Sequence, residues 1–143
     1  DDVYGILSAP PCTMFSLART RAKLPRDFKS GMELVIACLR IIRECRYKNP
    51  LKFWALENPM GYLRQFLGKP VFTFKRCQFG DDGGKPTDLW GYFSVPRVPY
   101  PNAKVKRGRN NTESKWYNSV NGSPTKRAIT PRGFAEAFYQ ANR

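Results

Sequence analysis

Short apolar runs flank one long helical pattern in the first part of the chain, and together they predict an α/β fold. Residues 4–7 and 53–56 have the length and character of buried strands. Between them, apolar residues recur at helical spacing over 30–48, with Ser30 as the expected N-cap and Asn49-Pro50 as the end. The apolar stripe comprises Leu34, Val35, Cys38, Leu39, Ile42 and Cys45. A helix between two such strands forms a βαβ unit, which implies parallel pairing.

The pattern that follows predicts a sheet with a terminal hairpin. We expect a short helix over 61–67, a strand over 71–79, a turn at 81–84 and a second strand over 89–95. Strands joined by a tight turn pair antiparallel, so the sheet becomes mixed at this point.

Three regions follow from these patterns. Residues 1–95 form the α/β portion, and 96–126 are rich in Pro, Asn, Gly and cations without any period. Residues 127–143 open a helix, with Thr130 as N-cap and Pro131 in the first turn, and this helix is expected to pack on the α/β portion.

The charge balance indicates a polyanionic partner. The 143 residues, enough for one ordinary domain, carry 25 Lys and Arg against 11 Asp and Glu, a net charge of +14. A domain this basic favours nucleic acid over a membrane surface, since no basic amphipathic helix with a broad apolar face stands out. With no leader pattern and no apolar run near 18 residues, we expect an intracellular, cytoplasmic protein with reduced thiols and no membrane association.

Cysteine spacing bears on both metal binding and packing. The cysteines are Cys12, Cys38, Cys45 and Cys77. There is no CxxC pair and no histidine, so a tetrathiolate zinc site is possible by number and poor by spacing. Cys38 and Cys45 lie on the helical stripe and are expected in the core, where unpaired cysteines usually pack.

The stretch Ser8-Ala-Pro-Pro-Cys-Thr-Met-Phe-Ser-Leu-Ala-Arg19 carries the candidate nucleophile. Two prolines end the first strand, and Cys12 follows them directly. A thiol placed where a strand passes into a loop faces a cleft, although a lone cysteine is more often a buried packing residue. This stretch resembles the Pro-Cys loop of the C5-cytosine methyltransferases, in which the nucleophilic cysteine is followed by Phe-Ser.

A second motif of the same family follows in the same order. Trp54-Ala-Leu-Glu-Asn-Pro59 is an apolar run that ends in Glu-Asn-Pro and resembles the family's Glu-Asn-Val motif. The resemblance implies that Cys12 is the catalytic nucleophile and that Glu57 is the carboxyl group that assists it at the base. It also implies a set of substrate-binding residues: Pro11, Ser16, Arg19, Asn58, Pro59, Lys85 and Thr87.

Two later segments resemble the family more loosely. The family has a Pro-Gln-x-Arg-x-Arg motif, and Pro86-Thr87 aligns with its start, so that Leu89 and Gly91 replace both arginines and Lys85 is the nearest cation. Residues 96–126 stand where the family has its target-recognition region, although this composition is also that of a disordered basic linker. The cations expected to contact nucleic-acid phosphates are Arg21, Lys23, Lys104, Lys106, Arg107, Arg109 and Arg127.

By the same resemblance, the chain corresponds to the C-terminal part of a Rossmann-like methyltransferase sheet. The family binds S-adenosylmethionine on a glycine-rich loop after its first strand, and no such loop precedes Cys12. We therefore expect the cofactor site to lie mostly outside this chain, in an N-terminal segment or a second chain. A compact recognition region suggests a bacterial or phage-encoded, restriction-modification type of enzyme that acts on DNA.

Two other interpretations remain open. The same chemistry could act on RNA, which a basic charge does not exclude, and competition between duplex DNA and structured RNA would separate these. The chain could also be a nucleic-acid-binding remnant without catalysis. A glycine-rich strand-loop-helix encoded upstream would favour the enzyme.

Overall fold

The structure, a computed structural model, describes residues 3–19, 22–105 and 128–143. The chain divides into two units, which are described separately below. The first unit comprises Asp1–Thr73 and Thr87–Phe93, and the second comprises Phe74–Pro86 and Ser94–Arg143. The predicted boundaries at 95 and 126 follow composition, whereas these units follow contacts along the folded chain.

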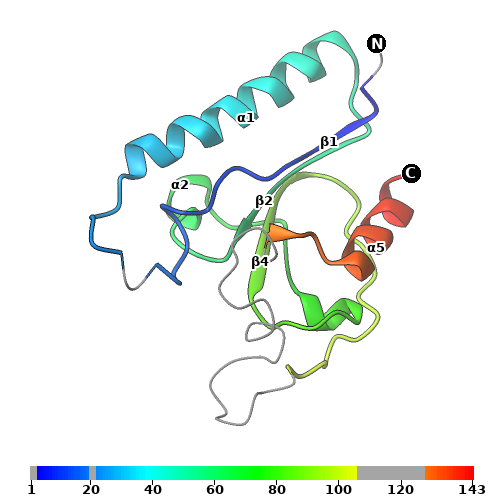
Figure 1. The fold of residues 1–143 in the computed structure, drawn as a ribbon. Helices are drawn as coiled ribbons and strands as arrows, with labels where there is room; N and C mark the ends of the chain where they lie inside the picture. The colour runs from blue at the N-terminus through cyan, green and yellow to red at the C-terminus, as the bar shows by residue number, and fades with distance from the viewer. Residues whose placement is uncertain (1–2, 20–21, 106–127) are drawn as a thin grey trace. The chain divides into compact units, whose positions relative to one another are not determined.

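The sheet is mixed, as shown in Figure 1, with strand order β1-β2-β4-β3, and its parallel pair β1 and β2 lies in the first unit. Strand β1 (Gly5–Ser8) pairs in parallel with β2 (Phe53–Pro59), from Gly5 opposite Phe53 to Ser8 opposite Leu56. Strand β4 (Pro86–Tyr92) runs antiparallel to β2, with Trp54 opposite Tyr92. The predicted α/β class, the parallel pair and the mixed sheet are therefore confirmed.

Helix α1 (Phe28–Lys48) connects the two parallel strands. Its cap differs from the prediction, because Asp27 is the N-cap and its carboxylate accepts a hydrogen bond of 3.0 Å from the backbone N–H of Ser30. An acidic cap also complements the positive end of the helix dipole, which favours Asp27 over a serine three residues later. The helix ends as expected before Asn49, whose N–H donates to Cys45 O.

The core of the first unit lies between α1 and the sheet. Val35 of α1 packs with Leu56 of β2 and Trp90 of β4, and the cluster is completed by Phe15 and Leu63. Cys38 and Leu39 pack against this cluster as half-buried residues, and Cys45 is half-buried as well.

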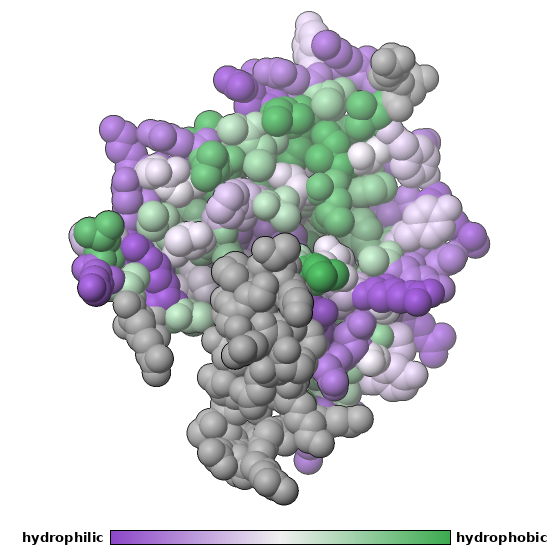
Figure 2. All heavy atoms as spheres, viewed as in Figure 1, coloured by the Kyte–Doolittle hydropathy of each residue, from purple (hydrophilic) through white to green (hydrophobic). Residues whose placement is uncertain are grey.

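The predicted apolar stripe of α1 is wrong at one position. Leu34 is 48% exposed. The buried face of the helix runs through Gly31, Val35 and Ile42, and Leu34 lies beside this face and points toward solvent. Figure 2 shows apolar side chains at the surface over α1 and the neighbouring β1. The exposed apolar residues of these two elements include Leu7, Leu34, Ile36, Ile41 and Tyr47.

The segment between α1 and β4 departs from prediction in its details. The short helix α2 is only Arg64–Leu67 and ends at Gly68, which has φ +74°. Strand β3 is limited to Phe72–Lys75, because the chain then turns into the 3₁₀ helix η1 (Arg76–Phe79). The side chain of Gln78 reaches back to accept from Lys75 N at 2.8 Å and stabilises this turn.

The link from β3 to β4 is therefore a 3₁₀ helix and a loop, and the prediction of a tight turn between the two strands is wrong. Strand β4 also begins at Pro86, earlier than predicted.

The second unit is organised around helix α5 (Arg132–Asn142). Phe134 stacks on Phe74 with ring centroids 3.9 Å apart, and it meets Phe79 edge-on at 5.5 Å. The predicted cap is wrong here too: Pro131 occupies the N-cap position without a side-chain hydrogen bond, and Thr130 is exposed. Instead, the carboxylate of Asp81 accepts a hydrogen bond of 2.9 Å from Gly133 N. Asp81 lies in a loop far away in the sequence, and it supplies the acceptor that an N–H group in the first turn of α5 lacks within the helix.

Arg76 and Asn142 form hydrogen bonds with the backbone of distant segments within the second unit. The Arg76 guanidinium donates to Asp82 O at 3.1 Å and to Ile129 O at 2.8 Å. Burial lowers the pKa of Arg76, and the nearby charge of Asp81 partly opposes that shift. The amide of Asn142 accepts from Ser94 N at 2.8 Å and donates to Ser94 O at 3.0 Å.

None of the helices described combines the length and apolar character needed to cross a bilayer.

Candidate functional site

The parallel register places both sequence motifs at one edge of the sheet. Ser8 of β1 lies opposite Leu56 of β2, and both strands continue in the same direction from there. Cys12 lies in the loop that follows the end of β1 at Ser8, and Glu57 comes directly after Leu56 in β2. The carboxyl ends of neighbouring parallel strands are where α/β proteins bind ligands. The structure thus brings the two motifs together from positions far apart in the sequence.

A buried hydrogen bond joins the two motifs directly. The side-chain Nδ2 of Asn58 donates to the carbonyl oxygen of Pro10 at 2.9 Å, and Asn58 is 0% exposed. Its Oδ1 is also buried and makes no hydrogen bond with a described residue. Burying the unpaired Oδ1 acceptor costs free energy. The hydrogen bond from Nδ2 to Pro10 O offsets part of the free-energy cost of burying the Asn58 amide.

Glu57 and Asn58 have different surroundings, because successive strand residues point to opposite faces of a sheet. Asn58 shares its face with Leu56, which belongs to the core under α1. Glu57 lies on the other face, is half-buried, and stands opposite Leu89 in the β2–β4 register.

Cys12 begins a single hydrogen-bonded turn, which we call the Cys12 turn (12–16). The carbonyl oxygen of Cys12 accepts from Phe15 N at 3.0 Å and from Ser16 N at 2.8 Å. The thiol-bearing residue is half-buried, whereas Phe15 and Ser16 are buried. The turn therefore fixes the backbone just after the candidate nucleophile while Cys12 itself stays accessible.

The segment after β2 supports the far side of this turn. Ser16 forms an isolated antiparallel bridge with Gly61, and the carbonyl oxygen of Phe15 accepts from Tyr62 N at 2.9 Å. A Cβ atom at Gly61 would collide with the Phe15 carbonyl oxygen, so the close approach requires glycine. The Phe15 ring is 0% exposed and stacks on Phe28 with centroids 6.1 Å apart.

Arg26 holds the Cys12 turn from its outer side. Its Nη1 donates to Met14 O at 2.8 Å, and its Nη2 donates to Ser16 O at 2.9 Å. The guanidinium carbon also lies 4.7 Å from the centroid of the Tyr62 ring. Arg26 closes the basic loop that follows the turn, and Arg19 within that loop donates to Pro25 O at 3.1 Å.

Strand β4 brings a third segment beside the Glu-Asn-Pro motif. Thr87 lies opposite Pro59 and Asp88 lies opposite Asn58, whereas Lys85 precedes the strand and is exposed. The resemblance assigns base contacts to this segment, and the register puts Thr87 next to β2 at the edge where the two motifs meet.

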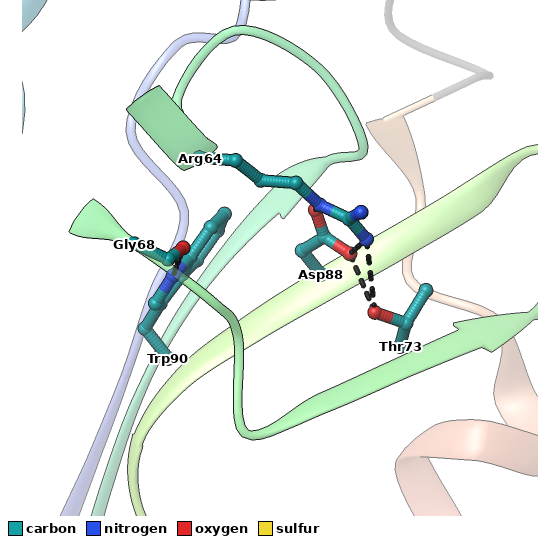
Figure 3. Close-up of polar contacts among 5 residues, drawn as sticks. All are labelled: Arg64, Gly68, Thr73, Asp88 and Trp90. Carbon is teal, nitrogen blue, oxygen red and sulfur yellow. Dashed lines mark hydrogen bonds and ion pairs between the residues drawn. The ribbon is translucent and has the colours of Figure 1, made fainter. Parts of the chain in front are cut away.

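Asp88 forms a buried charged network next to this segment, drawn in Figure 3. The carboxylate is 0% exposed and accepts from Arg64 Nε and Arg64 Nη2, each at 2.7 Å. The hydroxyl of Thr73 donates to the same carboxylate at 2.7 Å. Hydrogen bonding to Asp88 raises the pKa of Arg64, partial burial lowers it, and the charge of Asp88 adds to the rise.

Trp90 is fixed in the same region. Its indole Nε1 donates to Gly68 O at 3.0 Å, at the end of α2, as Figure 3 shows. The network and this bond together join α2, β3 and β4.

The remaining predicted site residues are exposed, apart from buried Ser16, or lie outside the described residues. Pro11, Lys23 and Lys104 are exposed, and Ser16 is buried with its hydroxyl accepting from Ala18 N at 3.3 Å. The predictions that fall outside the described residues are Arg21, Lys106, Arg107, Arg109 and Arg127.

We find no cofactor or metal site among the residues that the structure describes. No group of three or more metal-ligating side chains occurs in them. The loop after β1 carries Pro10 and Pro11, so it lacks the glycines that let a backbone approach a nucleotide cofactor. A hollow of about 440 Å³ beside α1 holds none of the predicted site residues, and we assign it no ligand.

Comparisons of the chain with protein-family models, curated proteins and solved structures gave no match. The resemblance to C5-cytosine methyltransferases therefore depends on the two motifs and on their placement in the fold.

Arg26, Arg64 and Asp88 are the residues of this region that sequence patterns did not single out. Arg26 ends a basic loop, and nothing in its neighbourhood indicates that it contacts two carbonyls behind it in the chain. Asp88 is buried, and a buried carboxylate requires a charged or hydrogen-bonding partner, but its position before Leu89-Trp90 does not identify Arg64 as that partner.

Proposed function

We propose that this chain carries the base-activating part of a DNA cytosine-C5 methyltransferase. The observation that supports the proposal most strongly is the 2.9 Å hydrogen bond from Asn58 Nδ2 to Pro10 O, which joins the Pro-Pro-Cys loop to the Glu-Asn-Pro strand end. Two motifs that resemble one family are thereby held together at the carboxyl ends of two parallel strands, where a shared substrate can meet both.

The chemistry assigns separate tasks to Cys12 and Glu57. The Cys12 thiolate adds to C6 of cytosine and forms a C–S bond, and the electron pair of the C5–C6 double bond moves into the ring toward N3. The Glu57 carboxyl holds a proton at N3 and so stabilises the developing negative charge. The product of this addition is nucleophilic at C5. Once C5 has taken an electrophile, loss of the original C5 proton restores the C5–C6 double bond and expels the Cys12 thiolate.

Methyl transfer would use S-adenosylmethionine, as the resemblance implies. The residues described here do not fit that cofactor, since β1 leads into Pro10-Pro11-Cys12 and not into a glycine-rich loop. We therefore assign no residue to it and derive only the steps that Cys12 and Glu57 perform.

Access to C6 requires that the target base leave the helical stack, because the reacting atoms are covered in a duplex. The net charge of +14 supports a role in holding the strand from which the base is extruded. Lys23 and Lys104 are exposed and available for phosphate contacts.

Exchange of the C5 hydrogen tests this proposal without any methyl donor. In D₂O, the adduct at C6 takes a deuteron at C5, loses the original proton and eliminates the thiolate, so cytosine gains one deuterium. We expect the chain to catalyse this exchange on cytosine-containing DNA, and Cys12→Ser to abolish it. Glu57→Gln should slow it by about 10²- to 10⁴-fold, the usual contribution of a positioned acid or base.

Cys45→Ser is the matched control, because Cys45 is a half-buried thiol on α1 that belongs to neither motif. Its exchange rate should equal that of the unaltered chain. Exchange that persists in Cys12→Ser would overturn the assignment of the nucleophile. The same assay on structured RNA identifies the substrate, since faster exchange on RNA would replace DNA in the proposal.

A further inference from the structure

Arg26 makes a two-point contact with the backbone of the Cys12 turn. One guanidinium nitrogen donates to Met14 O at 2.8 Å and the other donates to Ser16 O at 2.9 Å. These carbonyls flank Phe15, whose own carbonyl is bonded to Tyr62 N. Each of the three residues after Thr13 therefore has its carbonyl oxygen held by a donor from outside the turn.

The geometry suits arginine and does not suit lysine. A planar guanidinium presents parallel N–H groups to two acceptors at once, whereas an ammonium acts as a single point charge. The Tyr62 ring, 4.7 Å from the guanidinium carbon, supports the plane of the group from one side. Arg26 is itself half-buried, so these hydrogen bonds are partly shielded from competing water.

The Cys12 turn depends on contacts of two kinds. Inside the turn, Cys12 O accepts the N–H groups of Phe15 and Ser16. Outside it, Arg26 fixes the carbonyls of Met14 and Ser16. A single turn without a following helix gains little from cooperativity, and so it depends on such external donors to keep one conformation.

We propose that Arg26 is a positioning residue that sets the orientation in which Cys12 meets its substrate. It acts through the carbonyls of Met14 and Ser16 and does not touch the base. Its effect on catalysis rests on the proposed function, whereas its effect on the turn does not. The two are therefore tested by separate measurements.

Amide hydrogen exchange of the full chain tests the effect on the turn. Arg26→Gln removes the guanidinium group and with it the pair of hydrogen bonds to Met14 O and Ser16 O. The Phe15 and Ser16 amides should then exchange about 10- to 100-fold faster, as expected when hydrogen bonds to a charged group are removed. Arg26→Lys keeps the charge and one of the two hydrogen bonds, so it should give a smaller increase. Amides in the middle of α1 should be unchanged in both variants.

Arg40→Gln serves as the control, because Arg40 is an exposed arginine on α1 whose 3.7 Å ion pair with Glu44 is exposed at both ends. It should leave the Phe15 and Ser16 amides unchanged. Unchanged exchange of these two amides in both Arg26 variants would overturn the proposal. Arg26→Lys retains a cation beside the Tyr62 ring and keeps the test usable if Arg26→Gln does not fold.

Kinetics of C5-hydrogen exchange test the effect on catalysis. For Arg26→Lys we expect kcat to fall about 10-fold or more with KM unchanged, because the nucleophile is misplaced and the DNA is still bound. A raised KM with unchanged kcat would instead make Arg26 a phosphate-binding residue and overturn the positioning role. Absence of exchange in the unaltered chain would count against the proposed function, and the amide measurement would still decide whether Arg26 holds the turn.

Discussion

Removing Arg64 should destabilise the first unit strongly, because Asp88 would be left without its charged partner inside the protein. In Arg64→Met the carboxylate keeps the Thr73 hydroxyl as a hydrogen-bond donor and is deprived of two bonds of 2.7 Å. The methionine retains most of the apolar stem, so the change isolates the guanidinium.

The size of the effect follows from the difference in exposure between the partners. Asp88 is 0% exposed, whereas the side chain of Arg64 is 39% exposed. Breaking a buried ion pair typically costs about 3–5 kcal/mol, and partial exposure of one partner lowers this through solvent screening, so we expect about 3 kcal/mol. Asp88→Leu should cost about 1–2 kcal/mol, because Arg64 can turn into water while the leucine fills the site.

The double variant gives the sharpest test. Arg64→Met with Asp88→Leu leaves no buried charge at this position, and the double variant should be more stable than Arg64→Met alone. Urea unfolding followed by tryptophan fluorescence measures all three free energies, and urea is preferred because guanidinium chloride would screen the ion pair. Arg40→Met is the control and should not change stability measurably, since its pair with Glu44 is exposed at both ends.

Two results would refute this reasoning. If the double variant were destabilised by the sum of the two single changes, Arg64 and Asp88 would not be coupled. If Arg64→Met cost no more than Arg40→Met, Asp88 would be satisfied without Arg64.

Three further predictions concern DNA binding, the Cys12 turn and the cofactor. Alanine at the four cations between residues 104 and 109 should reduce the dependence of DNA affinity on salt. The slope of log binding constant against log salt concentration should become shallower by about 0.9 for each phosphate that is no longer neutralised. An unchanged slope would place the phosphate-binding cations elsewhere. Gly61→Ala should lower the melting temperature and speed amide exchange at Ser16, because its Cβ displaces the Phe15 carbonyl; normal exchange would show that the turn adapts. Calorimetric titration of S-adenosylmethionine into the 143-residue chain should show no measurable binding, and tight stoichiometric binding would mean that residues given other roles form that site.

The order of elements in the first unit was predictable because each depends on local pattern. The apolar runs at 4–7 and 53–56 became β1 and β2, and the helical spacing between them became α1. Parallel pairing then follows from the crossover alone. The placement of both motifs at one sheet edge needed no further information.

Caps and strand ends were predicted less well, since they depend on contacts that sequence patterns do not show. Ser30 and Thr130 are plausible caps in isolation, yet Asp27 caps α1, and Asp81 from a distant loop serves the start of α5. Strand β3 stops after Lys75 because Gln78 folds back onto the backbone, although the apolar alternation continues beyond it. Arg26 illustrates the same limit in the site, since its partners are backbone carbonyls, which every residue carries.

The hydrogen bond between Asn58 and Pro10 implies different tolerance to mutation at its two ends. Its acceptor is a main-chain oxygen, which a replacement of Pro10 would preserve, whereas its donor is an amide that only the side chain of Asn58 supplies. Aspartate at 58 would set a carboxylate oxygen against a carbonyl oxygen, and leucine would leave that carbonyl without its donor. Among descendants of this sequence that keep the two motifs joined, position 58 should therefore vary less than position 10.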